Sequence, residues 1–320
     1  MKQNTNALVK DRTTETVPEK NAPSSGGRQT LRKIEPYLWM LPSILLMAVM
    51  ILIPILTVFR LSAMEISRAG IVKGFNNFAN YKEVLTSPIF RHTLWNTLVW
   101  TVVVVGVSTL IGFVLAMVLN QNFRGRKFVR ALVIFPWATS LIIQAVIWKY
   151  IISADYGSLN VILSKLGLID QFINWTSSAA AFFAWECWVG VFVTVPFVTF
   201  CVLSGLQSID DTYYEAAEMD GAGFWKKLFS VTLPLVRPSL TVSTVLNIIY
   251  VFNSFPIVWT ISKGDPADKT HTLVTYLYKL SFTSGKSGLA AAVSVIGFVI
   301  LAICASVYMI LSLKGEEEGS

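Results

Sequence analysis

Six long apolar stretches, separated by shorter charged segments, constrain this sequence more than any other feature. Each holds about 20 predominantly apolar residues, the length that a helix needs to cross the hydrocarbon core of a bilayer. They occupy residues 37–61, 94–119, 131–152, 179–203, 239–261 and 289–313. Because 54% of the 320 residues are hydrophobic and 14% are charged, a soluble globule of this size could not bury so much apolar surface. The sequence therefore predicts an all-α membrane protein with six transmembrane helices.

The segments between these stretches divide the chain. Residues 1–36 mix Lys, Arg, Glu, Ser, Gly and Pro, and we expect them to form a disordered cytoplasmic leader. Residues 37–61 then form the first transmembrane helix and residues 62–93 an outer loop. Residues 94–313 hold the other five helices, and residues 314–320 form a cytoplasmic tail. The first helix is not a cleavable signal peptide, because it is too long and follows a polar leader.

Lysine and arginine are distributed unequally among the polar segments. Seven lie in the leader and four in the segment 120–130, whereas the segment 153–178 contains only Lys165. Because cytoplasmic segments carry the excess of Lys and Arg, both termini and the segment 204–238 are predicted to face the cytoplasm. Tryptophans gather near the predicted outer ends, as an interfacial belt does. These are Trp95, Trp100, Trp148, Trp175, Trp185, Trp188 and Trp259.

The charged and nucleophilic residues do not form the motifs of an enzyme or of a nucleic-acid-binding protein. The net charge of +7 is accounted for by topology signals and anionic-lipid contacts, since no basic patch with interleaved aromatic residues is present. His92 and His271 have no metal-ligand neighbour at helical spacing. Residues 285–288 (Gly-Lys-Ser-Gly) resemble the short motif of an intramembrane serine protease, but no histidine follows in a later span to act as the base. We interpret them as a polar turn, and we expect neither catalysis nor a bound metal or cofactor.

The cytoplasmic segment 204–238 has the pattern of a helical hairpin. Ser208, with Asp211 three residues later, is typical of a helix start. A short helix is expected at residues 212–219. It should end at Gly221, which can adopt the left-handed conformation that stops a helix.

A second short helix is expected at residues 224–231. Leu233 should leave the helical region because it precedes Pro234. On the first helix, Glu215 and Glu218 should share one face because they are three residues apart. The spacing alone does not distinguish a docking surface for another protein from a hairpin that merely joins two spans.

The hairpin carries a string that resembles a known family. Glu215-Ala216-Ala217, followed by Gly221 and then by Val231-Thr232-Leu233-Pro234, resembles the EAA loop of binding-protein-dependent ABC importer membrane subunits, with Val231 in place of the usual Ile. The longer string at residues 214–223 is similar to the sugar-importer branch, as in maltose permeases. Further matches are Gly74-Phe75, Asn80-Tyr81, Asn96-Thr97 and Gly157-Ser158-Leu159-Asn160, so the resemblance runs from about the first span to the sixth.

The resemblance implies a half-transporter with the type I ABC importer permease fold, in a bacterial or archaeal cytoplasmic membrane. In that family the EAA helix docks in a cleft of an ATP-hydrolysing subunit, and closure of the ATPase dimer switches the pore between inward- and outward-facing states. The implied partners are a second homologous permease (or a second copy of this chain), two ATP-binding subunits that hold ATP and Mg, and an extracytoplasmic solute-binding protein. The residues implied in coupling are Glu215, Ala216, Ala217, Glu218, Asp220, Gly221, Leu233 and Pro234.

Three consecutive spans contain an interior proline, at Pro136, Pro196 and Pro256. An interior proline frees a carbonyl group and breaks or kinks a helix, which lipid tolerates only where protein or a watery cavity covers the break. Two interpretations stay open, namely a solute cavity near the midplane or kinks that serve packing alone.

Polar and aromatic residues near these prolines are candidates for a solute pathway, because sugars stack on aromatic rings and bind amides and hydroxyls. From the residues alone, the candidates are Trp137, Thr139, Ser140, Thr194, Phe197, Asn247, Tyr250 and Asn253. Similarity to the maltose-type permease implies sugar contacts at Trp137, Leu141, Thr194, Phe197, Asn247, Tyr250 and Val251. Leu141 and Val251 are apolar where that permease has polar groups, so hydrogen bonding to the solute must differ. For each residue, helix packing is an equally weighted alternative.

Lys149 and Glu186 are the charged residues that lie well inside predicted spans, both toward the outer ends. An unpaired charge at that depth is costly, so we predict that they form an ion pair. The alternative is that Lys149 extends to the headgroups.

The leading hypothesis is a membrane subunit of an ATP-driven importer of a sugar or related carbohydrate. The alternative is a self-sufficient secondary transporter or channel for a small polar solute. That alternative would require ion-coupling charges near the midplane, and the predicted spans have none there.

Overall fold

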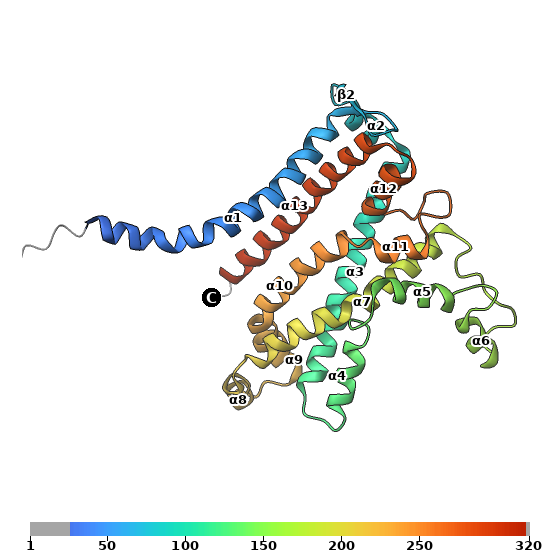
Figure 1. Ribbon diagram of the computed structural model, residues 1–320. Coiled ribbons are helices and arrows are strands. Elements are labelled where there is room, and N and C mark those ends of the chain that lie inside the picture. Colours follow the sequence, from blue (N-terminus) through green and yellow to red (C-terminus); the bar gives the residue numbers. More distant parts are fainter. Residues whose placement is uncertain (1–25, 318–320) are drawn as a thin grey trace, which may run out of the picture. The chain divides into compact units, whose positions relative to one another are not determined.

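The computed structural model of the protein describes residues 26–317 (Figure 1). Residues 1–25, most of the predicted leader, and residues 318–320 of the predicted tail lie outside this range. The described residues fall into two compact units, divided between Ile55 and Leu56. The elements are α1 (Gly26–Ser62), β1 (Met64–Ile66), β2 (Val72–Phe75), α2 (Ala79–Thr86), α3 (Pro88–Asn120), α4 (Arg126–Ile134), α5 (Leu141–Ile151), α6 (Ser158–Lys165), α7 (Ala179–Gln207), α8 (Asp211–Met219), α9 (Phe224–Lys227), η1 (Leu228–Thr232), α10 (Leu233–Phe252), α11 (Pro256–Ile261), α12 (Leu273–Tyr278), η2 (Lys279–Thr283) and α13 (Ser287–Glu317).

The described part of the first unit belongs entirely to α1. This helix begins at Gly26, so the expectation of a disordered leader is wrong for residues 26–36. From Trp39 onward most of its side chains in this unit are large, apolar and exposed, as contact with lipid requires. At the other end of the chain, α13 continues to Glu317 and includes residues that were expected to form the tail.

Within residues 26–317, five helices are long and apolar enough to cross a membrane. They are Trp39–Ser62, Pro88–Asn120, Ala179–Gln207, Phe224–Ile261 and Ser287–Ile310. The predicted third span, at residues 131–152, is instead divided between α4 and α5, and the apolar α5 is too short to cross alone. The helical membrane fold is confirmed, with an interrupted third segment.

Helices α3 and α7 share the most extensive contact of any two described elements. Glycines allow this close approach. A Cβ atom on Gly190 would lie 2.7 Å from the ring of Trp100, and one on Gly112 would lie 2.8 Å from the side chain of Val198. In lipid the hydrophobic effect does not drive helices together, so van der Waals contact between small residues must hold the pair.

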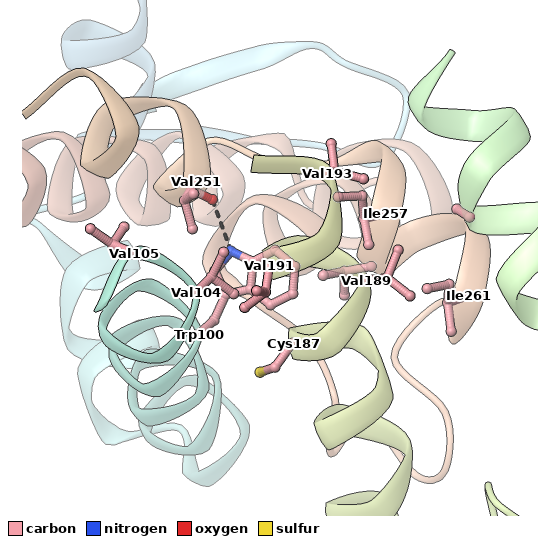
Figure 2. Close-up of a cluster of buried hydrophobic side chains, with 12 residues drawn as sticks. Trp100, Val104, Val105, Cys187, Val189, Val191, Val193, Val251, Ile257 and Ile261 are labelled. Carbon is pink, nitrogen blue, oxygen red and sulfur yellow. Dashed lines mark hydrogen bonds between the residues drawn. The ribbon is translucent and has the colours of Figure 1, made fainter. Parts of the chain in front are cut away.

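A buried cluster around Trp100 joins α3 and α7 to α10 and α11 (Figure 2). The Trp100 side chain is 1% exposed, and its indole Nε1 donates a hydrogen bond of 2.9 Å to the carbonyl oxygen of Val251 on α10. Val189 of α7 and Ile257 of α11 fill the cluster on the far side of the ring. The indole therefore satisfies a backbone group close to the end of α10.

Two of the three interior prolines interrupt their helices, and the third does not. The chain turns at residues 135–140 around Pro136, and it breaks again at residues 253–255, before Pro256 starts α11. Pro196 is buried inside α7, which runs without interruption from Ala179 to Gln207. Because α7 packs against both α3 and α10, its neighbours hold it continuous across the proline. The expectation of three broken spans is therefore wrong for the middle one.

Figure 1 shows two opposite ends in the second unit. We call the end with β1, β2 and α2 the loop end, and the end with α8 and α9 the hairpin end. At the loop end, β1 and β2 pair antiparallel, with Met64 opposite Phe75 and Glu65 opposite Gly74. This small hairpin lies in the predicted outer loop and was not anticipated by the all-α class.

Asn96 connects the loop after α11 to the start of α3. Its amide nitrogen donates to the carbonyl oxygens of Lys269 at 2.8 Å and His271 at 3.1 Å, residues that are 173 and 175 positions away in the sequence. The neighbouring Thr97 hydroxyl accepts a hydrogen bond of 2.8 Å from the backbone N–H of Leu273. The Asn96-Thr97 string therefore fixes a distant loop to α3.

Two other asparagines from the motif strings have similar structural roles at the loop end. The Asn80 amide donates to the carbonyl oxygens of Ser62 and Met64, each at 2.9 Å. Asn160 donates to the carbonyl oxygen of Ile173 at 2.9 Å, and its own oxygen accepts from the N–H of that residue at 3.2 Å. Each amide replaces backbone partners that an irregular loop lacks.

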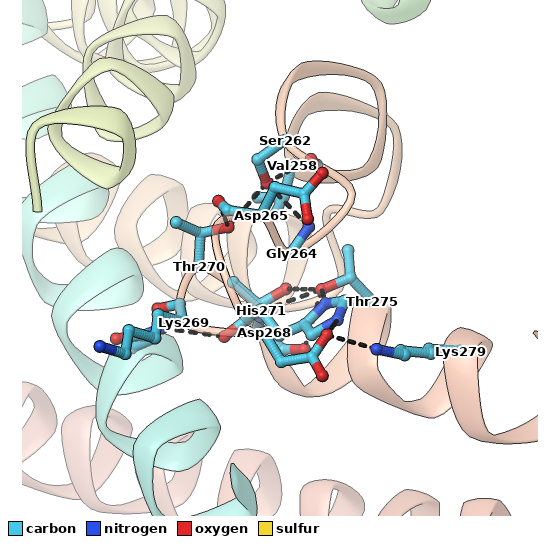
Figure 3. A network of polar contacts seen from close by, with 12 residues as sticks. Val258, Ser262, Gly264, Asp265, Asp268, Lys269, Thr270, His271, Thr275 and Lys279 are labelled. Atoms are coloured by element: carbon cyan, nitrogen blue, oxygen red, sulfur yellow. Dashed lines mark hydrogen bonds and ion pairs between the residues drawn. The ribbon is translucent and has the colours of Figure 1, made fainter. Parts of the chain in front are cut away.

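The loop after α11 is held by a network of buried polar groups (Figure 3). The Ser262 hydroxyl accepts a hydrogen bond of 2.8 Å from Thr270, while Asp268 pairs with Lys279 and lies 3.3 Å from Nε2 of His271. Burial favours a higher pKa for Asp268, but hydrogen bonding and the charge of Lys279 outweigh it, so this pKa lies below its usual value. Burial lowers the pKa of His271, against the opposing effect of Asp268. The packed loop therefore favours a neutral imidazole beside a charged carboxylate.

We expect Gly112→Leu to destabilise the protein by about 1–3 kcal/mol, because overpacking would separate α3 from α7. The matched control is Gly106→Leu on the same helix, where an added Cβ would meet nothing within 4 Å. The measurement is the midpoint of thermal unfolding of each purified variant in detergent. Equal midpoints for the two variants would contradict the close α3–α7 contact.

Candidate functional site

The first arm of the predicted hairpin is α8, and its N-cap is Asp210. The Asp210 carboxylate accepts a hydrogen bond of 2.9 Å from the backbone N–H of Thr212, and this bond lowers the pKa of Asp210. Ser208 lies instead at the end of α7, where its hydroxyl donates to the carbonyl oxygen of Gly205 at 2.7 Å. The predicted helix is confirmed, but Ser208 as its cap is wrong, because Asp210 is adjacent to the first turn.

Gly221 ends this arm in the left-handed conformation, with a φ of 72°. The N–H of Ala222 donates to the carbonyl oxygen of Ala217 at 2.9 Å, and the N–H of Gly221 donates to that of Glu218 at 2.9 Å. These two bonds form the helix-ending motif that favours glycine. The prediction that the helix stops at Gly221 is confirmed.

The second arm differs from the prediction. Helix α9 passes through the π-helical turn η1 directly into α10. Leu233 has helical dihedral angles of −66° and −43°, and its N–H donates to the carbonyl oxygen of Leu228 across the wider turn. Pro234 lies in the first turn of α10, where its missing N–H is tolerated. Leu233 therefore does not leave the helix, and the hairpin is continuous with α10.

The two glutamates of the hairpin have different surroundings. Glu218 forms an ion pair of 2.7 Å with Lys227 of the second arm, while the hydroxyls of Tyr214 and Thr232 lie 3.3 Å apart between the same arms. Glu215 is exposed and makes no ion pair with any described residue. Both glutamates lie on α8 three residues apart, as the expected shared face requires, but Glu218 connects the two arms whereas Glu215 does not.

The other predicted coupling residues lie on the surface of the hairpin. Ala216, Asp220, Leu233 and Pro234 are exposed, and Ala217 is half-buried. The second arm of the hairpin also presents three exposed aromatic rings that sequence reasoning missed. These are Phe224, Trp225 and Phe229, with the Trp225 and Phe229 rings stacked at a centroid distance of 6.2 Å. Their clustering in the segment 224–229 could have been noticed from the sequence.

Two of the predicted pathway residues meet at one cavity. The rings of Trp137, in the turn before α5, and Phe197, on α7, lie with their centroids 6.4 Å apart. They line a cavity of about 590 Å³. Its other walls come from α7 and α10, and they include Cys201, Ser204, Ser239 and Ser243. Aromatic rings and hydroxyls in one cavity provide the contacts that a sugar requires.

Three other predicted pathway residues are buried in helix contacts. Asn247 is 0% exposed, and its amide donates a hydrogen bond of 2.9 Å to the hydroxyl of Ser108 on α3. The Thr194 hydroxyl donates to the carbonyl oxygen of Gly190 on its own helix at 2.9 Å. Val251 is buried beside Trp100, as described above. In this conformation these three residues therefore contribute to helix packing and not to the cavity wall.

The remaining candidates lie near the helix breaks. Ser140 precedes α5 and is exposed, Leu141 is half-buried at its start, and Tyr250 and Asn253 are exposed at the end of α10. Gln144 was missed by sequence reasoning. Its amide donates to the carbonyl oxygen of Pro136 and to the Thr139 hydroxyl, closing the turn before α5. A polar amide shortly after an interior proline is the signal that could have identified it.

Lys149 and Glu186 do not pair. The Lys149 ammonium is exposed and donates to the carbonyl oxygen of Thr260 at 3.4 Å. Glu186 is 0% exposed, and neither of its carboxyl oxygens has a hydrogen-bond partner among the described residues. The Ser262 hydroxyl lies beside this carboxyl but outside hydrogen-bond geometry. The predicted ion pair is wrong because α11 lies close to both side chains and Lys149 is oriented toward the solvent or lipid.

No group of three or more His, Cys, Asp or Glu side chains within residues 26–317 is arranged to hold a metal ion. The helical bundle, the hairpin continuous with one of its long helices, and the cavity beside it define a multi-pass membrane permease. A family described as the binding-protein-dependent transport system inner membrane component matches residues 108–313. This chain belongs to that family and is an inner-membrane transport component.

Relatives match the chain over most of its length. A probable ABC transporter permease of Brucella suis is 43% identical over 88% of this chain and 98% of its own. The trehalose/maltose transport system permease MalF of Thermococcus litoralis is 34% identical over 85% of this chain and 92% of its own. The diacetylchitobiose uptake system permease DasB of Streptomyces coelicolor is 30% identical over 89% of this chain and 88% of its own.

A solved structure has the same fold. The crystal structure of a bacterial ABC transporter involved in the import of the acidic polysaccharide alginate contains a chain that matches with a TM-score of 0.79 and 20% identity. The match covers 90% of this chain and 98% of that one. The predicted permease fold is confirmed.

We expect Glu186→Gln and Lys149→Gln each to leave stability nearly unchanged, because neither side chain has an ionic partner to lose. An amide also has the shape of the carboxyl group that it replaces. The measurement is a double-mutant cycle on thermal stability, with a coupling below about 0.5 kcal/mol expected. A coupling energy well above that value would show instead that the two side chains form an ion pair.

We expect a hydrophilic, membrane-impermeant methanethiosulfonate reagent to modify Cys201 in a variant that keeps this cysteine and carries Cys187→Ser and Cys304→Ser. The thiol lines the cavity that Trp137 and Phe197 share, so water should reach it. The matched control keeps only Cys304, which is exposed on α13 within a candidate span, where lipid should protect it. Modification is followed by mass spectrometry, and equal rates at the two cysteines would contradict an aqueous cavity.

Proposed function

We propose that this chain forms one half of the transmembrane pore of an ATP-driven carbohydrate importer. The substrate class is supported by relatives named for trehalose, maltose and diacetylchitobiose transport, and by the rings of Trp137 and Phe197 at the cavity. A homologous permease or a second copy completes the pore, two ATP-binding subunits supply energy with ATP and Mg, and a solute-binding protein delivers the cargo. A structural neighbour that was crystallised with its substrate-bound periplasmic protein supports the last partner.

In this proposal the hairpin end faces the cytoplasm, and so do both termini. The cations at residues 124–130 lie at the hairpin end, as the positive-inside rule requires of a cytoplasmic surface. Toward the opposite side, the rings of Trp148 and Trp185 lie 6.3 Å apart, and those of Trp175 and Trp185 lie 5.8 Å apart. Such an aromatic cluster suits a membrane interface.

The observation that carries the proposal is the continuity of the hairpin with α10. A docked ATPase subunit would contact the exposed Glu215 and the aromatic cluster of Phe224, Trp225 and Phe229. Helices α9, η1 and α10 follow one another without a linker, so any displacement of α9 would pass directly into α10. The ion pair between Glu218 and Lys227 helps the two arms to move together.

The far end of α10 brings this displacement to the candidate pathway. Tyr250 and Asn253 lie where α10 stops. The side-chain amide of Asn253 donates a hydrogen bond of 2.8 Å to the carbonyl oxygen of Ile249, and this bond caps the end of the helix. Beyond the break, α11 packs mainly against α5. The break therefore separates a segment that moves with the hairpin from one that packs mainly on α5.

The proposal is tested by reconstitution into lipid vesicles. The complete transporter, energised by ATP and supplied with its solute-binding protein, should accumulate the carbohydrate, and this chain alone should not. Uptake by this chain alone, without ATP hydrolysis, would instead establish the secondary transporter or channel.

We expect Gly221→Val to reduce ATP-dependent uptake by at least about tenfold while the transporter still assembles. Valine strongly disfavours the positive φ at this position, so the turn between the hairpin arms would change direction. Assembly is measured by co-purification, and uptake and ATP hydrolysis in the same vesicles.

The matched control is Gly223→Val, two residues away. Gly223 has an ordinary φ of −71°, and at both glycines an added Cβ would meet nothing within 4 Å. The two substitutions therefore add the same side chain, and only the first strains the backbone. Wild-type uptake in Gly221→Val, or an equal loss in both variants, would contradict a role for this turn in coupling.

A further inference from the structure

A groove runs between α3 and α7 on the loop-end half of the bundle, with a volume of about 660 Å³. Neither the coupling hairpin nor the candidate pathway uses it. Apart from its mouth, its walls in the described chain are apolar, with small and branched side chains facing one another across it. These side chains include Val99, Val103 and Val107 on α3, and Ala180, Ala184 and Val191 on α7.

The depth of the groove matches one leaflet of a bilayer. Its lining residues extend from Trp95 to Val107 along α3 and from Ala179 to Val191 along α7. At about 1.5 Å per residue, each row covers about 18 Å. The hydrocarbon core is roughly 30 Å thick, so the groove reaches from one membrane surface to about the midplane.

The mouth of the groove is basic and polar. His92 and Lys269 are exposed there, and the backbone of Lys269 is fixed in place by the 2.8 Å hydrogen bond from Asn96. The ring of Trp95, which is 65% exposed, also lines the groove near this mouth. Cations and a tryptophan at the mouth of an apolar groove reproduce the order of phosphate, interface and acyl chain in a lipid.

We propose that this groove binds one anionic phospholipid of the leaflet at the loop end. An acyl chain lies between Val103 and Ala184, and the phosphate accepts hydrogen bonds from the Lys269 ammonium and from the imidazole N–H of His92. The assignment of this leaflet to the outer side rests on the proposed orientation, but the site itself does not.

The structure disfavours other occupants. A sugar would find few hydrogen-bonding groups along the walls, and the amide nitrogen of Asn96 already donates to two carbonyl oxygens. The volume lies within the roughly 300–1,000 Å³ of small-ligand pockets.

The test uses the complete transporter in phosphatidylcholine vesicles that contain a trace of phosphatidylglycerol with a photoreactive diazirine in the middle of one acyl chain. After illumination, labelled sites on this chain are mapped by mass spectrometry. We expect labelling concentrated between Val99 and Val107 and between Ala180 and Val191. The same diazirine on phosphatidylcholine should label these sites less.

Two variants and their matched controls test the headgroup and the chain separately. Lys269→Glu should reduce labelling by at least about fivefold, the effect of one cation beside an anionic lipid. Lys263→Glu, in the same loop but outside the groove, should not. Ala184→Trp should fill the groove and abolish labelling, whereas Val102→Trp, at a 70% exposed position of α3, should not.

Because Lys269 is exposed in a loop, its substitution should not prevent folding. The Lys269→Glu variant therefore still tests the proposal if the Ala184→Trp variant fails to assemble. Uniform labelling of all exposed apolar helices, unchanged by Lys269→Glu, would overturn the proposal. Equal labelling by the two lipid probes would also overturn it, as would a crosslink to a second permease chain from a photoreactive residue placed at position 184.

Discussion

A backbone amide or carbonyl group without a partner costs several kcal/mol inside a membrane, and this constraint shapes each irregular point of the bundle. At the break before α5, the Gln144 amide donates to the carbonyl oxygen of Pro136. Near the end of α10, the indole of Trp100 donates to the carbonyl oxygen of Val251. At the hairpin junction, the π-helical turn keeps the N–H of Leu233 bonded without a change of direction. The interrupted helices are therefore stabilised by particular side chains and turns that add hydrogen bonds at these points.

The same constraint explains what could be predicted from the sequence. The long helices follow from the length of apolar chain that a bilayer demands, and the end of α8 follows from the conformational freedom of Gly221. The sequence did not distinguish Pro136, where the chain breaks, from Pro196, where it does not. That difference is tertiary, because α7 is enclosed by α3 and α10, whereas the turn at Pro136 depends on Gln144.

For the candidate site residues, too, the sequence identified the residue types but not their contacts. Residue type and spacing marked Asn247 as polar and intramembrane, but its partner Ser108 lies 139 positions away, so periodicity alone could not separate packing from solute contact. Trp137 and Phe197 were selected in the same way, and they meet at a cavity because the turn before α5 places one ring against α7. The Asn96-Thr97 string was noticed as a pattern, but its bonds to the loop after α11 required the fold.

These contacts also decide which parts can move together in the proposed mechanism. Helices α3 and α7 are fixed to each other at Gly190 and Gly112, and α10 packs closely on α7 where Gly205 faces Ser239. The bond between Trp100 and Val251 ties the far end of α10 to α3. A displacement of the hairpin must therefore carry all three helices as one body, because separating them would expose a buried indole and a carbonyl group. It follows that the cavity walls on α7 and α10 keep their relative positions in this mechanism, whereas Trp137, in the turn before α5, moves with α5. Opening and closing then occur where this body faces α5, α11 and a second permease.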